Sequence, residues 1–225
     1  MNSRLSLFLR ACAFLLCGIL VLGLLLFLPA GTIHYPGAQR LLMLLFVPML
    51  LMGVVLFFKA PDLLRKRLQS KEKEAAQRGV IGASALMFLF AFVLAGLDFR
   101  FGLTQIPAGL STAAGILFLL GYAMYAEVLR ENTYLSRTIE VQENQTVVST
   151  GLYGVVRHPM YAATILMFLA MPLVLGSVIG LIFLLPYPVL IARRIRDEEQ
   201  LLRAELPGYD EYCRKVRWRM IPWVW

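Results

Sequence analysis

An arginine and a histidine stand side by side just before a long apolar run, in the stretch Gly151-Leu-Tyr-Gly-Val-Val-Arg-His-Pro-Met-Tyr161. His158 is one of only two histidines in the chain. The apolar run Ala162–Ala192 follows at once and ends at the charged sequence Arg193-Arg-Ile-Arg-Asp-Glu-Glu199. Ionisable side chains at the edge of a bilayer are costly unless they are paired or functional. Both ends of the run are therefore candidates for a binding or catalytic site.

The two charged ends can face one pocket if the chain turns back in the middle of the apolar run. A run of about 30 residues is too long for one ordinary helical span at 1.5 Å per residue. Its centre carries Gly176-Ser177, so we expect a helical hairpin, or one span with a re-entrant piece. Such a turn would bring Tyr161 to the depth of Arg194 and Glu198, which are i,i+4 neighbours on one helical face.

The composition places these residues in a membrane protein. The chain is 59% apolar and only 16% charged, whereas soluble domains are about 45–50% apolar and about 25% charged. Crossing a hydrocarbon core takes about 20 mostly apolar residues in a helix. We therefore predict an all-α membrane protein, a polytopic helical bundle of about five to six transmembrane segments with a C-terminal helical hairpin and a cytoplasmic tail. The four segments before the hairpin are Ala11–Leu28, Leu41–Phe58, Val80–Leu97 and Pro107–Ala126.

The net charge of +8 is distributed unevenly, and its distribution predicts an orientation. Basic residues gather in the loop Lys59–Arg78 and in the tail after Ala192, while the loops Pro29–Arg40 and Asp98–Ile106 hold few. The positive-inside rule then places both termini and the Glu127–Tyr161 segment, and hence the candidate site, in the cytoplasm. An integral protein of the bacterial inner membrane is expected. Topology and attraction to anionic lipids account for the basic charge, so no nucleic-acid partner is expected.

Several other kinds of site are excluded by spacing. Cys12 and Cys17 fall in the first span and Cys213 in the tail, so neither a disulfide nor a metal site is expected. A glycine-rich G-x-G-x-x-G turn after a strand is also missing from the sequence. Any nucleotide-like cofactor would therefore have to be held by the membrane helices and the tail.

Taken singly, the polar residues have ordinary interpretations: His158 as a packing histidine, Tyr161 as an interfacial aromatic residue, and Arg193–Glu199 as a solvated helix end. In combination they resemble the isoprenylcysteine carboxyl methyltransferase family. The resemblance is strong over residues 97–225 and only architectural before them. It rests on Gly-x-Tyr-x-x-x-Arg-His-Pro-x-Tyr, Arg-x-x-x-Glu-Glu, Pro207-Gly-Tyr-Asp-Glu-Tyr212 and Val216-Arg-Trp-Arg-Met-Ile-Pro222, with Leu97–Gly102 and Arg130–Ser136 similar to the bacterial branch.

The resemblance implies transfer of a methyl group from S-adenosylmethionine to the carboxylate of an isoprenylcysteine-like or other lipophilic acceptor. It divides the chain into an N-terminal two-span region, residues 1–78, and a methyltransferase-like core, residues 79–225. Arg194 and Arg157 are implied to orient the substrate. Where Pro and Gly are frequent in the family, this chain has Leu152 and Ala163, and Ala163 is expected to add a methyl group near the pocket. The implied cofactor-binding residues are Tyr153, Gly154, Val155, Val156, His158, Tyr161, Leu166, Met167, Phe168, Leu169 and Glu198.

Three alternatives stay open on the sequence, along with the acceptor's identity and the oligomeric state. The acceptor is expected to be a lipophilic or lipidated molecule that arrives from the bilayer, but a phospholipid amine would also fit, with His158 as the nearby base. An NADPH-dependent reductase of the sterol-reductase type shares Arg-His-Pro-x-Tyr, although Met160 and Ala163-Thr164 depart from the pattern usual there. The third alternative is a non-catalytic membrane partner that retains the scaffold.

Overall fold

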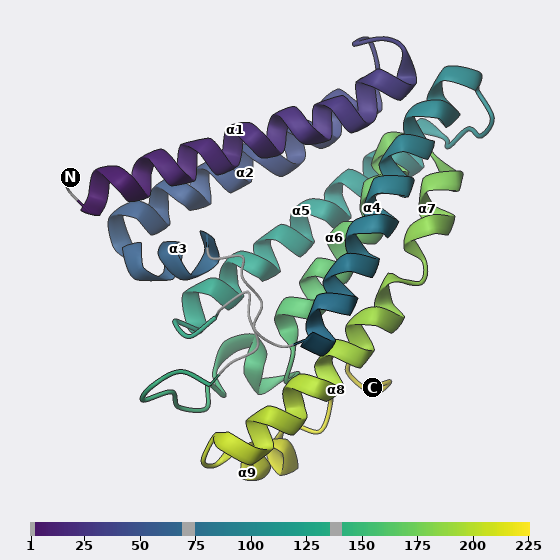
Figure 1. Ribbon diagram of the computed structural model, residues 1–225. Helices are drawn as coiled ribbons and strands as arrows, with labels where there is room; N and C mark the ends of the chain where they lie inside the picture. Colours follow the sequence, from purple (N-terminus) through teal and green to yellow (C-terminus); the bar gives the residue numbers. More distant parts are fainter. Residues whose placement is uncertain (1–2, 69–74, 136–140) are drawn as a thin grey trace.

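The computed structural model describes residues 3–68, 75–135 and 141–225, and within those ranges the chain is helical and contains no strand (Figure 1). Four long helices come first and are followed by the hairpin and the tail. The long helices are α1 (Ser3–Ala30), α2 (Pro36–Lys59), α4 (Ala75–Phe101) and α5 (Ala108–Glu131). The remaining elements are α3 (Pro61–Leu68), the short 3-10 helix η1 (Gly151–Gly154), α6 (Pro159–Leu175), α7 (Val178–Leu184), α8 (Tyr187–Glu205) and α9 (Tyr209–Lys215).

The long helices present apolar side chains outward as well as inward. Leu28 is 75% exposed and Phe58 is 76% exposed, although both are large and apolar. Only a hydrocarbon surrounding makes such exposure favourable over whole helices. In the described ranges, five segments are long and apolar enough to cross a membrane: Arg4–Ala30, Pro36–Lys59, Gly79–Phe101, Ala108–Glu131 and Val178–Glu205. The predicted polytopic helical architecture is confirmed, and each predicted span lies in one of the long helices, except that Pro107 stands just before α5.

The predicted hairpin is also confirmed, and it turns at Gly176 and Ser177. Gly176 ends α6 with φ of 83°, a left-handed conformation that glycine adopts without steric cost. The Ser177 hydroxyl accepts a hydrogen bond from the Gly180 amide (3.0 Å) and donates one to the buried Asp98 carboxylate of α4 (2.5 Å). The chain then descends through α7 and α8, which are separated at Pro186. At 17 residues, α6 rises only about 26 Å, somewhat less than a full hydrocarbon core of about 30 Å.

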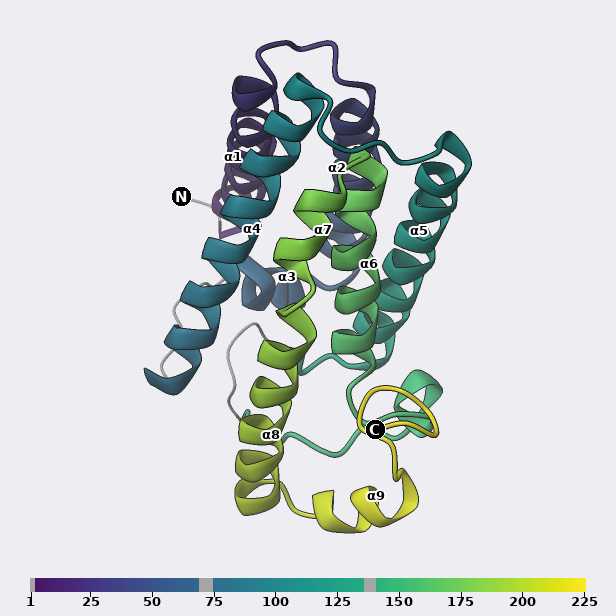
Figure 2. The same ribbon diagram turned by 90° about the vertical axis from the view of Figure 1, so that its right-hand side faces the viewer.

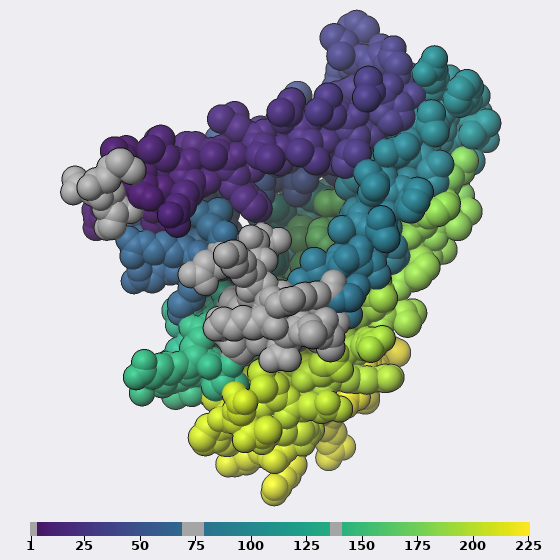
Figure 3. All heavy atoms as spheres, viewed as in Figure 1, coloured from purple at the N-terminus to yellow at the C-terminus, as the bar shows by residue number. Residues whose placement is uncertain are grey.

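The apex of the hairpin packs against the start of α2 through backbone atoms. The Tyr35 hydroxyl donates to the Leu175 carbonyl (2.7 Å), and a Cβ on Gly37 would lie 2.7 Å from the same oxygen. From this contact α1 and α2 diverge from the bundle of α4 to α8, as Figure 1 shows. In the space-filling view, α1 and α4 part below their contact and leave a hollow between them (Figure 3).

The opposite end of the molecule gathers the polar elements. The end of α5, η1, the start of α6, the lower part of α8 and α9 all lie there (Figure 2). The basic loop Lys59–Arg78 contributes α3 to this end, while residues 69–74 lie outside the described part of the chain. In this arrangement the two charged ends of the hairpin reach the same level, and α9 with the C-terminal segment covers them.

Candidate functional site

The motif Arg157-His158 is held in place by the last residues of the chain. The Arg157 amide donates to the Trp218 carbonyl (2.9 Å), and the His158 amide donates to the Arg219 carbonyl (2.7 Å). The residue before a proline is biased toward an extended conformation, and His158 precedes Pro159. The His158 backbone is accordingly non-helical, with φ of −126° and ψ of 59°. The two successive amides bond to the C-terminal segment, and the two parts of the chain form one unit just before α6 begins.

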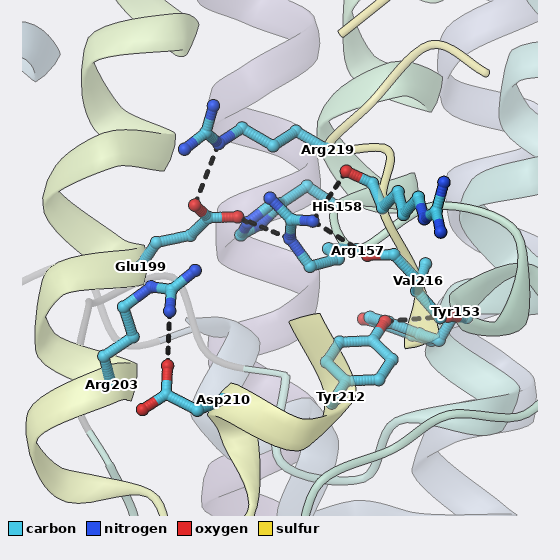
Figure 4. Close-up of polar contacts among 10 residues, drawn as sticks. Tyr153, Arg157, His158, Glu199, Arg203, Asp210, Tyr212, Val216 and Arg219 are labelled. Carbon is cyan, nitrogen blue, oxygen red and sulfur yellow. Dashed lines mark hydrogen bonds and ion pairs between the residues drawn. The ribbon is translucent and has the colours of Figure 1, made fainter. Parts of the chain in front are cut away.

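A buried carboxylate, Glu199 of α8, ties this unit to the hairpin (Figure 4). Its side chain is only 3% exposed. It accepts from Arg157 Nε at 2.7 Å and from Arg219 Nε at 2.8 Å, and His158 Nε2 lies 3.3 Å away. Buried charges need such pairing to persist in a folded protein. Glu199 is not among the residues predicted from the sequence, although its spacing gave a signal: Ile191, Ile195 and Glu199 follow each other at intervals of four along the buried face of α8.

Arg157 forms hydrogen bonds both to α8 and to the C-terminal segment. Besides Glu199, it donates from Nη1 to the carbonyls of Val216 and Arg217, each at 2.8 Å. The side chain is 7% exposed. Figure 4 shows Arg157 enclosed between α8 and the C-terminal segment.

Next to the Glu199 cluster, a second group of polar side chains joins α6 to α8. Arg194 Nε donates to the Tyr161 hydroxyl (3.0 Å), and that hydroxyl donates to Glu198 Oε2 (2.7 Å). Tyr161 is buried, whereas Arg194 and Glu198 are half-buried. The predicted juxtaposition of Tyr161 with both α8 residues is therefore present, and a tyrosine hydroxyl connects a cation to an anion.

These side chains line a cavity of about 100 Å³ between α6, α8, α9 and the segment before η1. Its wall includes the predicted residues Tyr153, Arg157, His158, Tyr161, Arg194 and Glu198. Arg194 and Glu198 form one charged part of the wall, Arg157 and His158 add further polar groups, and most of the other lining residues are apolar or aromatic. The other lining residues are Asn132, Tyr134, Leu135, Gln145, Thr146, Val147, Val148, Met160, Leu201, Leu202, Leu206, Tyr209 and Tyr212.

The structure does not bring the other predicted cofactor residues, Gly154, Val155, Val156 and Leu166–Leu169, to this cavity. Val155 is 53% exposed. Phe168 packs against the rings of Phe88 and Tyr187, with centroids 4.8 and 5.3 Å away. Phe168 of α6 therefore packs on α4 and α8 and does not face the cavity.

Ala163 and Met167 lie on the face of α6 that packs against α5. A Cβ on Gly121 would come within 2.7 Å of Met167 Cγ and 3.1 Å of the Ala163 carbonyl. Ala163 is fully buried there and is absent from the cavity wall. The expected methyl group near the pocket therefore fills a helix–helix contact instead.

Two tyrosines of α9 meet at the aromatic end of the cavity, with ring centroids 5.8 Å apart. The Tyr212 hydroxyl donates to the Tyr153 carbonyl (2.7 Å), as Figure 4 shows. The Tyr209 hydroxyl is buried and has no hydrogen-bond partner in the described part of the chain. Burial and the charge of Glu199 raise the pKa of Tyr209 above its usual value, so the hydroxyl keeps its proton.

Comparisons with known proteins concern the region that holds this site and the fold of the whole chain. Residues 110–206 match the family model described as phospholipid methyltransferase. This matched region runs from α5 to the end of α8, and so contains both the Arg157-His158 motif and the Arg194–Tyr161–Glu198 group.

The whole chain also has a solved structural relative. The eukaryotic intramembrane Ras methyltransferase, isoprenylcysteine carboxyl methyltransferase, superposes with a TM-score of 0.60 at 16% identity, covering 100% of this chain and 79% of that one. The predicted resemblance is thus confirmed at the level of the fold, including the N-terminal helices outside the region that the family model matches.

Curated relatives match shorter stretches. The mouse Delta(14)-sterol reductase TM7SF2 is 36% identical over 95 residues, which are 39% of this chain and 22% of that protein. The cobalt-zinc-cadmium resistance protein CzcN of Cupriavidus metallidurans is 33% identical over 83 residues, 35% of this chain and 37% of that protein. The chain therefore spans well under half the length of these curated relatives.

Proposed function

We propose that the protein is a membrane methyltransferase that uses S-adenosylmethionine and methylates the carboxylate of an isoprenylcysteine-like or other lipophilic acceptor. The observation that carries the proposal is the Arg194–Tyr161–Glu198 group on the wall of the cavity, within the region that matches the phospholipid methyltransferase model. A fixed arginine suits an anionic acceptor, and a carboxylate suits a cationic cofactor. The orientation proposed for the site is cytoplasmic.

The residues of the cavity fit this cofactor by their chemistry. Glu198 offers a carboxylate to a cationic group, and the wall around Tyr209 and Tyr212 offers flat apolar surface to a purine ring. The cavity of about 100 Å³ is smaller than the 300–1,000 Å³ typical of pockets that enclose such ligands. Binding therefore requires the walls to move apart. When bound, S-adenosylmethionine supplies an electrophilic methyl group.

Arg194 is the residue proposed to orient the acceptor. A carboxylic acid with an ordinary pKa near 4 is ionised at neutral pH, so the reaction needs no strong general base. Water weakens such an anion as a nucleophile, and a contact to Arg194 in a partly closed pocket replaces part of that hydration. Its bond to the Tyr161 hydroxyl limits how far Arg194 can neutralise the acceptor, which avoids excessive ground-state binding.

Arg157 is better suited to positioning than to contact with the acceptor. Its hydrogen bonds to Glu199, Val216 and Arg217 direct Nε and Nη1, which carry three of its five N–H donors, to the tail and to α8. We therefore propose that Arg157 and Glu199 hold the motif against the hairpin, while Arg194 orients the acceptor. His158 Nε2 lies near Glu199, so it is engaged in the same cluster. This arrangement favours an acceptor that needs no base over a phospholipid amine.

A ligand titration of the detergent-purified protein tests the proposal. S-adenosylmethionine and S-adenosylhomocysteine should bind, and a ligand at 100 times its Kd should stabilise the folded state by about 2.7 kcal/mol. NADPH serves as the comparison because a stretch of the chain is similar to a sterol reductase. Binding of NADPH without binding of either S-adenosyl compound would overturn the proposal in favour of the reductase.

Substitutions at the charged end separate the two proposed roles. Arg194→Ala should lower methyl transfer to a prenylated thiol acid at least 100-fold and cofactor affinity much less, because a charge-assisted hydrogen bond of about 3 kcal/mol is lost on the acceptor side. Glu198→Ala should lower both. Arg203→Ala is the matched control: Arg203 also lies on α8, and it loses only a half-exposed ion pair with Asp210 of α9. Equal cofactor affinity in Glu198→Ala and the unaltered protein would remove the role given to Glu198.

A further inference from the structure

The hydroxyl of Tyr209 is a buried polar group that the fold leaves without a partner. Tyr209 is 4% exposed and belongs to a small apolar cluster with Leu206, Tyr212 and Val216. A buried hydroxyl without a hydrogen bond is costly, and the large majority of such groups in folded proteins are paired. The Tyr209 side chain forms part of the cavity wall, so a molecule that enters the cavity can supply the missing partner.

The neighbouring tyrosine shows what the fold does when it satisfies such a group. Tyr212 has the same side chain, stands on the same short helix and lines the same cavity. Its hydroxyl is used internally, on the Tyr153 carbonyl at 2.7 Å. One tyrosine of the pair thus holds η1 against α9. The side chain of the other forms part of the cavity wall, and its buried hydroxyl has no hydrogen-bond partner in the described part of the chain.

The cavity selects an elongated ligand with two different ends. Arg194, Glu198 and Leu202 follow each other at intervals of four along α8, so they share one face and span about 12 Å. The wall is charged at the first two and apolar from Leu202 to Leu206 and the α9 tyrosines. A ligand lying along this face therefore has its charged groups near Glu198 and a flat apolar group near Tyr209.

We propose that the Tyr209 hydroxyl hydrogen-bonds to the edge of the nucleoside base of the cofactor; this rests on the proposed function. A purine is flat enough to lie against the leucine and tyrosine side chains, and its edge carries hydrogen-bonding groups. The phenol of Tyr209 can donate and accept, so it can pair with such an edge. Tyr209 is in this view a binding residue for the base, with no part in the methyl transfer itself.

Tyr209→Phe removes the hydroxyl alone and leaves the ring. The detergent-purified variant should bind S-adenosylhomocysteine about tenfold more weakly, equivalent to the net loss of one hydrogen bond. Its thermal stability without ligand should be equal to or above that of the unaltered protein, because no internal bond is lost. The matched control, Tyr212→Phe, should instead lower the stability. Affinity of Tyr209→Phe within twofold of the unaltered protein would overturn the inference.

A base-modified ligand assigns the contact to the base edge. S-inosylhomocysteine, in which a carbonyl replaces the exocyclic amine, should bind the unaltered protein more weakly than S-adenosylhomocysteine, and Tyr209→Phe should largely abolish that difference. Independent effects of the two changes would contradict the base assignment. If the unaltered protein binds neither compound, it is the proposed function that fails, and the two failures are thereby distinguished.

Discussion

At the scale of single residues, the candidate site depends on a carboxylate that is absent from the cavity wall. Glu199 is shared by Arg157, Arg219 and His158, which come from the motif and from the tail. A buried ion pair adds little net stability compared with apolar packing, but removal of one partner leaves the others unpaired. Glu199 thereby makes the position of the Arg157-His158 motif depend on the presence of the last residues of the chain.

Glu199→Gln should therefore destabilise the protein by about 3 kcal/mol, because two arginines lose their counter-charge in a buried setting. Thermal unfolding of the detergent-solubilised protein measures the change. Asp210→Asn is the control, since its pair with Arg203 is half-exposed and exposed pairs contribute little. Equal loss of stability in the two variants would show that the cluster has no special structural role.

At the scale of helices, close contacts between backbones bring the elements together. Membrane helices associate through small residues because there is little hydrophobic driving force between them in lipid. A Cβ on Gly96 of α4 would lie 2.7 Å from the Leu26 carbonyl of α1, and one on Gly37 of α2 would lie 2.7 Å from the Leu175 carbonyl of α6. These contacts join the N-terminal helices to the bundle at the end opposite the cavity.

Gly37→Ala should destabilise the fold by about 1–3 kcal/mol, because its new methyl group meets a backbone oxygen that cannot turn aside. Gly53→Ala in the same helix is the matched control, since nothing lies within 4 Å of its added methyl group. Thermal unfolding of both variants in one detergent gives the comparison. A Gly37→Ala protein as stable as Gly53→Ala would mean that α2 does not pack on the hairpin apex.

At the scale of the whole molecule, the fold separates an end with little basic charge from an end rich in arginine and lysine. The α1–α2 and α4–α5 loops lie at the end of the hairpin apex, while α3, α8 and α9, with their basic residues, lie at the other (Figures 1 and 2). Loops rich in arginine and lysine stay in the cytoplasm. The cavity lies at the basic end, so on the proposed function we expect S-adenosylmethionine to enter it from the cytoplasm.

Accessibility to a membrane-impermeant maleimide tests this orientation in intact cells. In a variant with Cys12, Cys17 and Cys213 replaced by serine, Gln105→Cys in the α4–α5 loop should be labelled from outside, because that loop has little basic charge. Glu143→Cys, before η1, should react only after the membrane is permeabilised. Both positions are exposed, so a difference reports sidedness rather than burial. The reverse labelling pattern would place the cavity outside.

The sequence alone determined the spans, the hairpin and the placement of Arg194 and Glu198 on one face of a helix. A bilayer forces an apolar chain into helices, glycine favours a turn at 176, and the spacing of four is a property of any helix. The tertiary structure alone decided which way side chains face. It turned Met167 to α5, Phe168 to α4 and α8, and Arg157 to Glu199 and the C-terminal segment, and it left the Tyr209 hydroxyl unpaired. These directions depend on neighbours far along the chain, whereas the helix period depends only on adjacent turns.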